Sequence, residues 1–224
     1  MAKNTKKVEK NEFDESIAAS VSFFEKNKTK ILTCCGVVVA VIICALLVHQ
    51  FIITPRNQKA EESIFAAQTL FQTGDYEKAL KGDETTMGFL AIADKFKCTK
   101  TANVAKLYAG ICYAETGKYE EAVKMLNSYD GKGDALISPA ATAALGNCYA
   151  QLGQNEKAVE YLLKAAKQAD SDVLSPTYLI EAGQLYEAME KPEKALECYK
   201  QVKEKYQQSL QFNEIDKYIE RLSK

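Results

Sequence analysis

Histidine, tryptophan and proline are scarce in this chain of 224 residues, which holds one histidine, no tryptophan and four prolines. No histidine follows His49, so the last three quarters of the chain can form neither a serine–histidine–aspartate triad nor a histidine-containing zinc site. Nor is there a GxxxxGK[ST] or GxGxxG motif to hold phosphate. We therefore predict that the chain is not an enzyme and has no cofactor and no metal site.

Charge of a single dominant sign is also missing, since 29 basic residues face 30 acidic ones. Residues 1–30 carry seven basic and five acidic side chains, and residues 54–224 carry 22 basic and 25 acidic ones. Neither part has the dense positive charge that binding to nucleic acid requires. We expect no nucleic-acid partner.

The chain contains one long apolar run, residues 31–53, which has no charged side chain between Ile31 and Val48. About 20 helical residues cross a bilayer, and a helix satisfies its own backbone groups there. The run is too long, and lies too far from residue 1, for a cleavable signal peptide. We predict a transmembrane helix that stays as an anchor; the competing reading is a buried core helix.

The orientation of this anchor follows from the lysine and arginine residues beside it. Lys26, Lys28 and Lys30 precede the run, whereas only Arg56 and Lys59 follow it closely. The positive-inside rule then keeps the N-terminus in the cytoplasm and exports the larger part. We expect a single-pass membrane protein whose C-terminal domain is exported.

The segment before the anchor has a pattern of its own. Phe13, Ile17, Val21 and Phe24 recur at intervals of four, four and three, which predicts one apolar helix face. This amphipathic helix could lie in the membrane interface or dock on a membrane partner. The predicted organisation is a cytoplasmic tail at 1–30, the anchor at 31–53, a connector at 54–62 and a repeat domain at 63–224.

The repeat domain contains recurring glycine, tyrosine and alanine residues. In three stretches a tyrosine follows a glycine by three residues and an alanine follows it by twelve: Gly110, Tyr113 and Ala122; Gly146, Tyr149 and Ala158; Gly183, Tyr186 and Ala195. A degenerate fourth copy runs from Ala67 to Ala79. It is followed by about nine extra residues near Gly82–Gly88, which we expect to break the second helix of that hairpin.

These residues resemble the tetratricopeptide repeat, above all in GNCYAQLGQNEKAVEYLLKAAK from Gly146 to Lys167. The resemblance implies an all-α fold, a right-handed helical solenoid of about four hairpins. The segment Leu210–Leu222 is amphipathic, which predicts a C-terminal cap helix. One hairpin cannot bury its apolar face alone, so the hairpins must stack. Gly74, Gly117 and Gly153 stand where the turn between the helices needs a positive φ.

In this family the first helix of each hairpin lines a concave surface that binds proteins. The resemblance therefore implies a partner-binding surface made of Leu107, Ile111, Glu115, Asn147, Gln151, Ile180, Gln184 and Glu187. Its mixture of apolar and amide or acidic groups suits a helix or an extended segment.

Four cysteines lie in the repeat domain. Cys112 and Cys148 share one repeat position, and equivalent first helices are too far apart for a disulfide, whose Cα atoms lie within about 7 Å. We expect these two to be buried thiols and Cys98 and Cys198 to be unpaired as well. Free thiols are more common in the cytosol than in exported proteins, which argues against the predicted orientation.

The layout of tail, anchor and repeat domain resembles the ancillary subunit family of the bacterial SecYEG translocon (YfgM-like), as does the stretch Glu15–Lys28 ahead of the anchor. The resemblance implies a bacterial inner-membrane protein with its repeat domain in the periplasm. It also implies a role as a scaffold or chaperone accessory at the protein-export machinery, with translocon subunits and exported client proteins as partners. The alternatives are an adaptor for envelope assembly, at the outer membrane or the division site, and a membrane adaptor that faces the cytosol.

Overall fold

The computed structural model of the protein describes residues 25–30, 32–131 and 134–223. Within these residues every regular element is a helix, and the β-type pairing is limited to an isolated bridge between Gly82 and Met87. The predicted all-α class is confirmed. The chain divides into two compact units, Met1–Arg56 and Asn57–Lys224, which are described separately. The amphipathic helix predicted from Phe13 to Phe24 lies outside the described residues.

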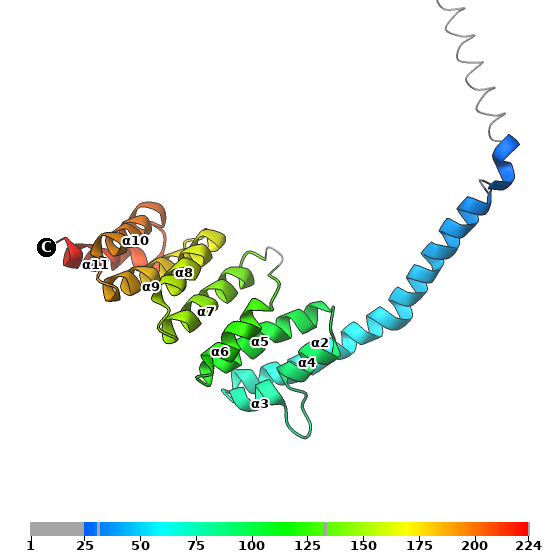
Figure 1. Ribbon diagram of the computed structural model, residues 1–224, viewed down its shortest axis with the longest axis horizontal. Helices are drawn as coiled ribbons and strands as arrows, with labels where there is room; N and C mark the ends of the chain where they lie inside the picture. Colours follow the sequence, from blue (N-terminus) through cyan, green and yellow to red (C-terminus); the bar gives the residue numbers. More distant parts are fainter. Residues whose placement is uncertain (1–24, 31, 132–133, 224) are drawn as a thin grey trace, which may run out of the picture. The chain divides into compact units, whose positions relative to one another are not determined.

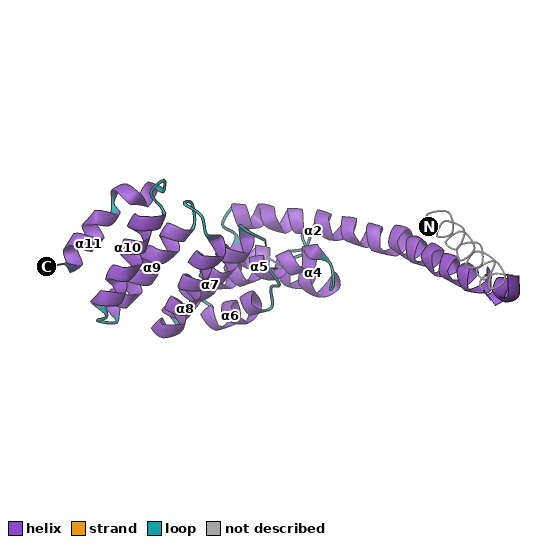
Figure 2. Ribbon diagram, turned by 90° about the horizontal axis from the view of Figure 1, so that it is seen from above, coloured by secondary structure: helices purple, strands orange, loops and turns teal. Residues whose placement is uncertain are grey.

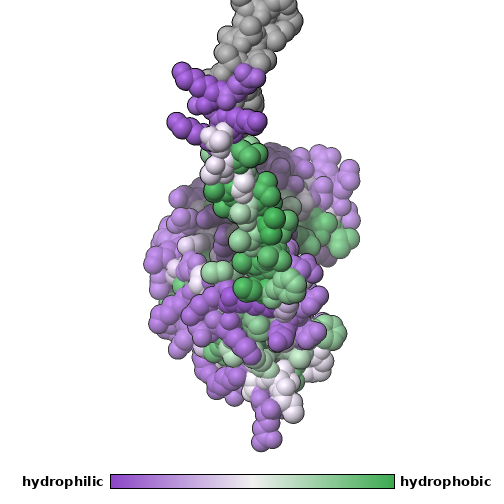
Figure 3. Space-filling model, turned by 90° about the vertical axis from the view of Figure 1, so that its right-hand side faces the viewer, coloured by the Kyte–Doolittle hydropathy of each residue, from purple (hydrophilic) through white to green (hydrophobic). Residues whose placement is uncertain are grey.

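The first unit contains one long helix. Residues 25–30 and 32–48 are α-helical and lead into a π-helical turn, η1 (His49–Ile53). Its large apolar side chains are uncovered: Leu32 and Phe51 are each 72% exposed. Figure 3 shows hydrophobic side chains gathered along this helix beyond its hydrophilic start. The helix Glu25–Gln72 is long and apolar enough to cross a membrane, and it is the one such helix in the part of the chain that the structure describes.

The connector predicted at 54–62 is helical, since these residues form the first half of α2 (Thr54–Gln72). Pro55 lies inside the helix, although proline has no N–H to donate and clashes with the carbonyl four residues earlier. The wider turn of η1 precedes it, with the Thr54 N–H bonded to the His49 carbonyl five residues back, and this spacing accommodates the proline. Ala60, buried in the core, shows that the repeat domain begins before residue 63.

The second unit is a row of helical hairpins, in which helices adjacent in sequence pack against one another (Figures 1 and 2). After α2 the helices are α3 (Tyr76–Lys81), α4 (Phe89–Lys95), α5 (Lys100–Glu115), α6 (Tyr119–Asn127), α7 (Ile137–Gln151), α8 (Asn155–Ala169), α9 (Ser175–Ala188), α10 (Pro192–Lys205), η2 (Leu210–Asn213) and α11 (Ile215–Leu222). The predicted four hairpins are confirmed, and the closing helix predicted at Leu210–Leu222 is a 3-10 turn, η2, followed by the shorter α-helix α11. The first hairpin pairs α2 with α3 and α4.

The break in the first hairpin lies where the glycine spacing predicted it. α3 ends at Lys81, and α4 resumes the second helix at Phe89, which is fully buried together with Ile92. Between them, the Asp83 carboxylate accepts hydrogen bonds from the backbone N–H groups of Thr85 and Thr86, at 2.8 and 2.7 Å. The insertion is therefore a compact loop, and the core of the hairpin continues past it.

A glycine of the first helix meets a large side chain of the second helix in each of the last three hairpins. A Cβ atom added to Gly110 would lie 2.6 Å from Leu126 Cγ, and one added to Gly146 would lie 2.9 Å from Leu162 Cγ. Leu126, Leu162 and the equivalent Tyr199 are 2% exposed or less. The glycines recur because the two helices of a hairpin approach closely at this point.

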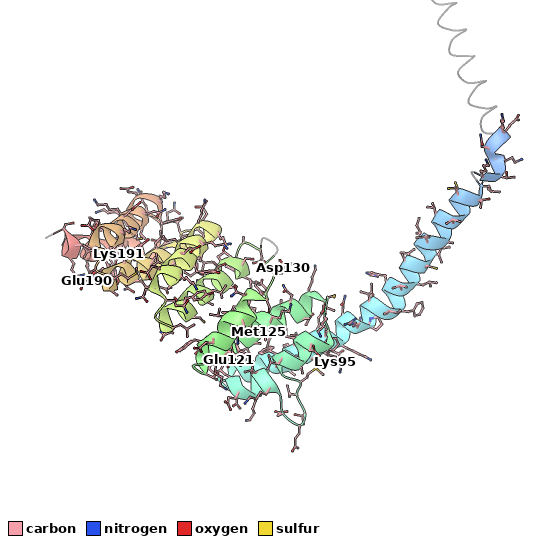
Figure 4. The ribbon with its side chains drawn as sticks, in the orientation of Figure 1. Lys95, Glu121, Met125, Asp130, Glu190 and Lys191 are labelled. Atoms are coloured by element: carbon pink, nitrogen blue, oxygen red, sulfur yellow. The ribbon has the colours of Figure 1, made fainter. Side chains whose placement is uncertain are left out.

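The turns inside the hairpins have the predicted backbone conformation. Gly74, Gly117 and Gly153 have φ values of 80°, 75° and 71°. In the fourth hairpin Glu190 takes the same position with φ 57°, a left-handed conformation that a residue with a side chain rarely adopts. Figure 4 shows Glu190 and Lys191 at this turn between α9 and α10.

The closing helix α11 takes the position of the first helix of a fifth hairpin. Its apolar residues Ile215, Ile219 and Leu222 follow Tyr178, Ala182 and Leu185 of α9 by the same 37 residues that separate the last two repeats. All six residues belong to, or pack against, one hydrophobic cluster. The cap thus covers the apolar face that the fourth hairpin would otherwise expose.

Candidate protein-binding face

Equivalent positions on three first helices form the centre of the surface that we expected to bind a partner. Ile111 on α5, Asn147 on α7 and Gln184 on α9 follow one another at intervals of 36 and 37 residues. Ile111 is half-buried, and the side chains of Asn147 and Gln184 are exposed. Glu115 and Gln151, one helical turn further on, are exposed as well. We call Ile111, Glu115, Asn147, Gln151, Ile180 and Gln184 the first-helix face.

Leu107 does not belong to this surface. It is 7% exposed and lies in a hydrophobic cluster with Leu126, Ala141 and Leu145. The reason is that α7 packs against both helices of the preceding hairpin, α5 and α6. We therefore correct the prediction for Leu107, which stabilises the stack and is not available to a partner.

Glu187 is committed to contacts within the protein. Its Oε1 atom accepts hydrogen bonds from the Tyr199 hydroxyl at 2.5 Å and from Arg221 at 2.6 Å. The Glu187 side chain is 24% exposed. Glu187 therefore fastens the cap helix to the fourth hairpin, and its contact with a partner stays a prediction.

Ile180 lines an open pocket of about 210 Å³ between α9 and the C-terminal segment. The other lining residues are Thr177, Glu181, Gln211, Glu214 and Tyr218. Thr177, Ile180 and Glu181 share one face of α9 with Gln184, because residues three and four apart lie on the same side of a helix. Gln211 closes one end of the pocket by donating a hydrogen bond to the Thr177 hydroxyl at 3.1 Å.

Glu181 is a pocket residue that the sequence reasoning missed. Its Oε2 atom is buried and has no hydrogen-bond partner among the described residues. Burial raises the pKa of the Glu181 carboxyl above its ordinary value of 4.5, and a hydrogen bond from Asn147 opposes this only in part. The available signal was its repeat position, since Tyr108 and Ala144 are the equivalent residues of the two preceding hairpins and only in the fourth hairpin is this residue a carboxylic acid.

The two kinds of helix differ in charge. α7 contains no charged residue, and α9 contains Glu181 and Glu187 but no lysine or arginine. The second helices α8 and α10 are rich in lysine: Lys157, Lys164, Lys167, Lys194, Lys200, Lys203 and Lys205. The first-helix face is therefore neutral to acidic over the last two hairpins, and the basic side chains are on the other helices.

The cysteines offer no reactive group at this face. All seven are free, as expected for the four in the repeat domain. Burial raises the pKa of the Cys112 thiol to about 12 and those of Cys148 and Cys198 to about 11, which leaves them as unreactive thiols. Cys98 is exposed. Among the described residues, no three histidine, cysteine, aspartate or glutamate side chains are grouped to hold a metal ion.

Comparison with known proteins identifies the repeats. Two tetratricopeptide repeat family models match the chain, one over residues 104–129 and the other over residues 138–208. These ranges correspond to the second hairpin and to the third and fourth, so the chain contains tetratricopeptide repeats. No curated protein matches it significantly in sequence.

Solved structures of the same fold include a crystal structure of MamA protein, with a TM-score of 0.53, 14% identity, and coverage of 73% of this chain and 89% of that one. A second is a Podosopora anserina putative kinesin light chain with nearly identical TPR-like repeats, with a TM-score of 0.57, 14% identity and coverage of 74% and 86%. At this identity they show a shared tetratricopeptide-type solenoid and nothing about partners.

Proposed function

We propose that this chain is a membrane-anchored scaffold that holds other proteins on its first-helix face. The observation that carries the proposal is the row of Ile111, Asn147 and Gln184, which leaves one apolar or polar side chain accessible on the first helix of each of the last three hairpins. Tetratricopeptide repeats serve as interaction scaffolds, and the uncovered apolar helix of residues 32–53 supplies the anchor. Residues 31–53 span the bilayer once in this proposal, with the tail in the cytoplasm.

The proposed place of action is the protein-export machinery of a bacterial inner membrane. The support is the resemblance in layout and in the tail stretch Glu15–Lys28 to ancillary SecYEG subunits, together with the excess of lysine before the anchor. In this role the tail and anchor contact translocon subunits, and the periplasmic repeats act as a chaperone accessory for exported clients. An envelope-assembly adaptor would have the same architecture and a different set of captured proteins.

Site-specific photo-crosslinking in native membranes tests the proposal. A crosslinking amino acid placed at Asn147 or Gln184 should capture client proteins, and one placed at Val39 in the anchor should capture translocon subunits. Glu160 and Glu197 are the matched controls, because both are exposed, lie on second helices and are 37 residues apart. Capture that is equal from the controls and from the first-helix face would refute the proposed binding surface, and absence of translocon subunits would refute the export role.

The free thiols favour a second candidate, an adaptor whose repeat domain faces the cytosol. Seven unpaired cysteines, one of them exposed in the repeat domain, fit a reducing compartment better than an oxidising one. A membrane-impermeant maleimide applied to intact spheroplasts distinguishes the two orientations, in a variant whose Cys34, Cys35 and Cys44 are replaced by serine. Labelling of Cys98 before lysis supports the exported domain, and labelling only after lysis supports the cytosolic one.

A further inference from the structure

We propose that the pocket between α9 and the C-terminal segment receives a lysine or arginine side chain of the bound protein. The inference rests on the proposed function and specifies the chemistry of the partner at one end of the first-helix face. The pocket therefore binds segments that carry a lysine or arginine in preference to segments that carry neither.

The lining of the pocket suits a long side chain that ends in a cation. Glu181 and Glu214 place two carboxylates in it, while Ile180 and the ring of Tyr218 supply apolar wall. The volume of about 210 Å³ is enough for one side chain and too small for a helix. Lysine and arginine have apolar stems that pack on such walls and heads that donate to carboxylates.

The unpartnered oxygen of Glu181 points to a donor that the chain itself does not provide. An ionised carboxylate oxygen that is shielded from water and has no hydrogen bond costs free energy, which a bound donor restores. No lysine or arginine lines the pocket. Of the basic side chains nearby, Arg221 binds Glu187 at 2.6 Å. Lys217 pairs with the pocket residue Glu214 at 4.0 Å, a long and exposed contact that a bound cation replaces.

The charge distribution of the array supports the same occupant. The first helices α7 and α9 carry two glutamates and no basic residue, whereas the second helices α8 and α10 carry seven lysines and five glutamates, a net charge of +2. The first-helix face is therefore the more favourable of the two surfaces for a cationic segment. Such complementarity governs where a partner docks and which partners are excluded.

Paired peptides that differ only in charge test the proposal. The probe is a short fluorescent peptide of leucine, serine and alanine with one central arginine, and its match carries citrulline, the uncharged analogue with nearly the same shape. Binding is measured on the full chain in phosphatidylcholine nanodiscs, whose neutral surface does not attract the cation. We expect the arginine peptide to bind about tenfold more tightly, as one charged hydrogen bond provides.

The variants Glu181→Gln and Glu214→Gln should each reduce this preference for arginine at least about threefold. Glu197→Gln, on the exposed side of α10, is the matched control and should keep the preference. Circular dichroism verifies that each variant folds. If one pocket variant does not fold, the other still tests the pocket.

Equal binding of the arginine and citrulline peptides, or a preference that survives both pocket variants, would overturn the pocket while leaving the scaffold function intact. Absence of binding by both peptides at millimolar concentration would also overturn it. The scaffold function itself fails only in the crosslinking experiment, so the two failures are distinguishable.

Discussion

Glu187 of α9 accepts a hydrogen bond from Arg221 of α11 at 2.6 Å across 34 residues of sequence. The same carboxylate oxygen accepts the hydroxyl proton of Tyr199 of α10 at 2.5 Å, so a single atom joins the three last α-helices. Tyr199 is fully buried, and its ring lies 5.1 Å from that of Tyr218 on α11. The cap is therefore held by a charged contact at its exposed edge and by apolar contacts beneath it.

Replacement of Arg221 by alanine should weaken the attachment of the cap. Arg221 is 57% exposed, which limits the effect to about 1 kcal/mol in the free energy of unfolding. The measurement is thermal unfolding of the full chain in nanodiscs, followed by far-UV circular dichroism. Lys217→Ala is the control, because its contact with Glu214 is long and exposed, and it should change stability by less than about 0.5 kcal/mol.

If Arg221→Ala and Lys217→Ala have equal effects, the contact with Glu187 does not hold the cap. A second check is Glu187→Gln in the Arg221→Ala background. Because both changes remove the same contact, the double variant should be less destabilised than the sum of the single variants.

The turn of the fourth hairpin predicts a stabilising substitution. Glu190 has φ 57° where the three earlier hairpins have glycine, and a side chain in the left-handed region is strained. Glu190→Gly should raise the free energy of unfolding by about 1 kcal/mol, after allowance for the greater freedom of glycine in the unfolded chain. The matched opposite is Gly153→Glu, at φ 71°, which should lower it by a similar amount. If Glu190→Gly is less stable than the parent, contacts of the glutamate side chain stabilise the fold by more than the strain of its positive φ destabilises it.

The features that the sequence revealed are those that depend on neighbours close in the chain. The offset from Gly146 to Ala158 defines one hairpin, and the glycines that flank the loop after Lys81 mark the insertion, so both were predictable. Leu107 was assigned wrongly because its burial depends on α7, which belongs to the next hairpin. The internal contact of Glu187 was not predictable because its partner, Arg221, lies on a helix outside the repeat pattern.

Because α7 and α8 approach closely at Gly146, a single added methyl group should destabilise the third hairpin. A Cβ atom at residue 146 would lie 2.9 Å from Leu162 Cγ and 3.0 Å from the Ala158 carbonyl oxygen, which is part of the backbone. Gly146→Ala should therefore lower the free energy of unfolding by about 1–3 kcal/mol. Leu162→Ala alone should also destabilise, through the cavity it leaves. Combined, the two changes should cost less than their sum, and strict additivity would contradict the proposed contact.

Glu181 predicts a pH-dependent gain in stability. Burial raises its pKa above 4.5, so between 4.5 and that raised pKa the folded protein keeps a proton that the unfolded chain has released. Stability contributed by this group is therefore present at low pH and is lost as pH rises through the folded pKa.

Glu181→Gln removes the charge without removing the shape, and should raise the free energy of unfolding at neutral pH by about 1 kcal/mol, the lower end of the cost of an unpaired buried polar group. The free energy of unfolding of variant and parent is compared at each pH, so that the effects of the other carboxyl groups cancel. The higher stability of the variant should disappear below pH 4.5. An advantage that is equal at acidic and neutral pH would mean that the buried charge of Glu181 is not its source.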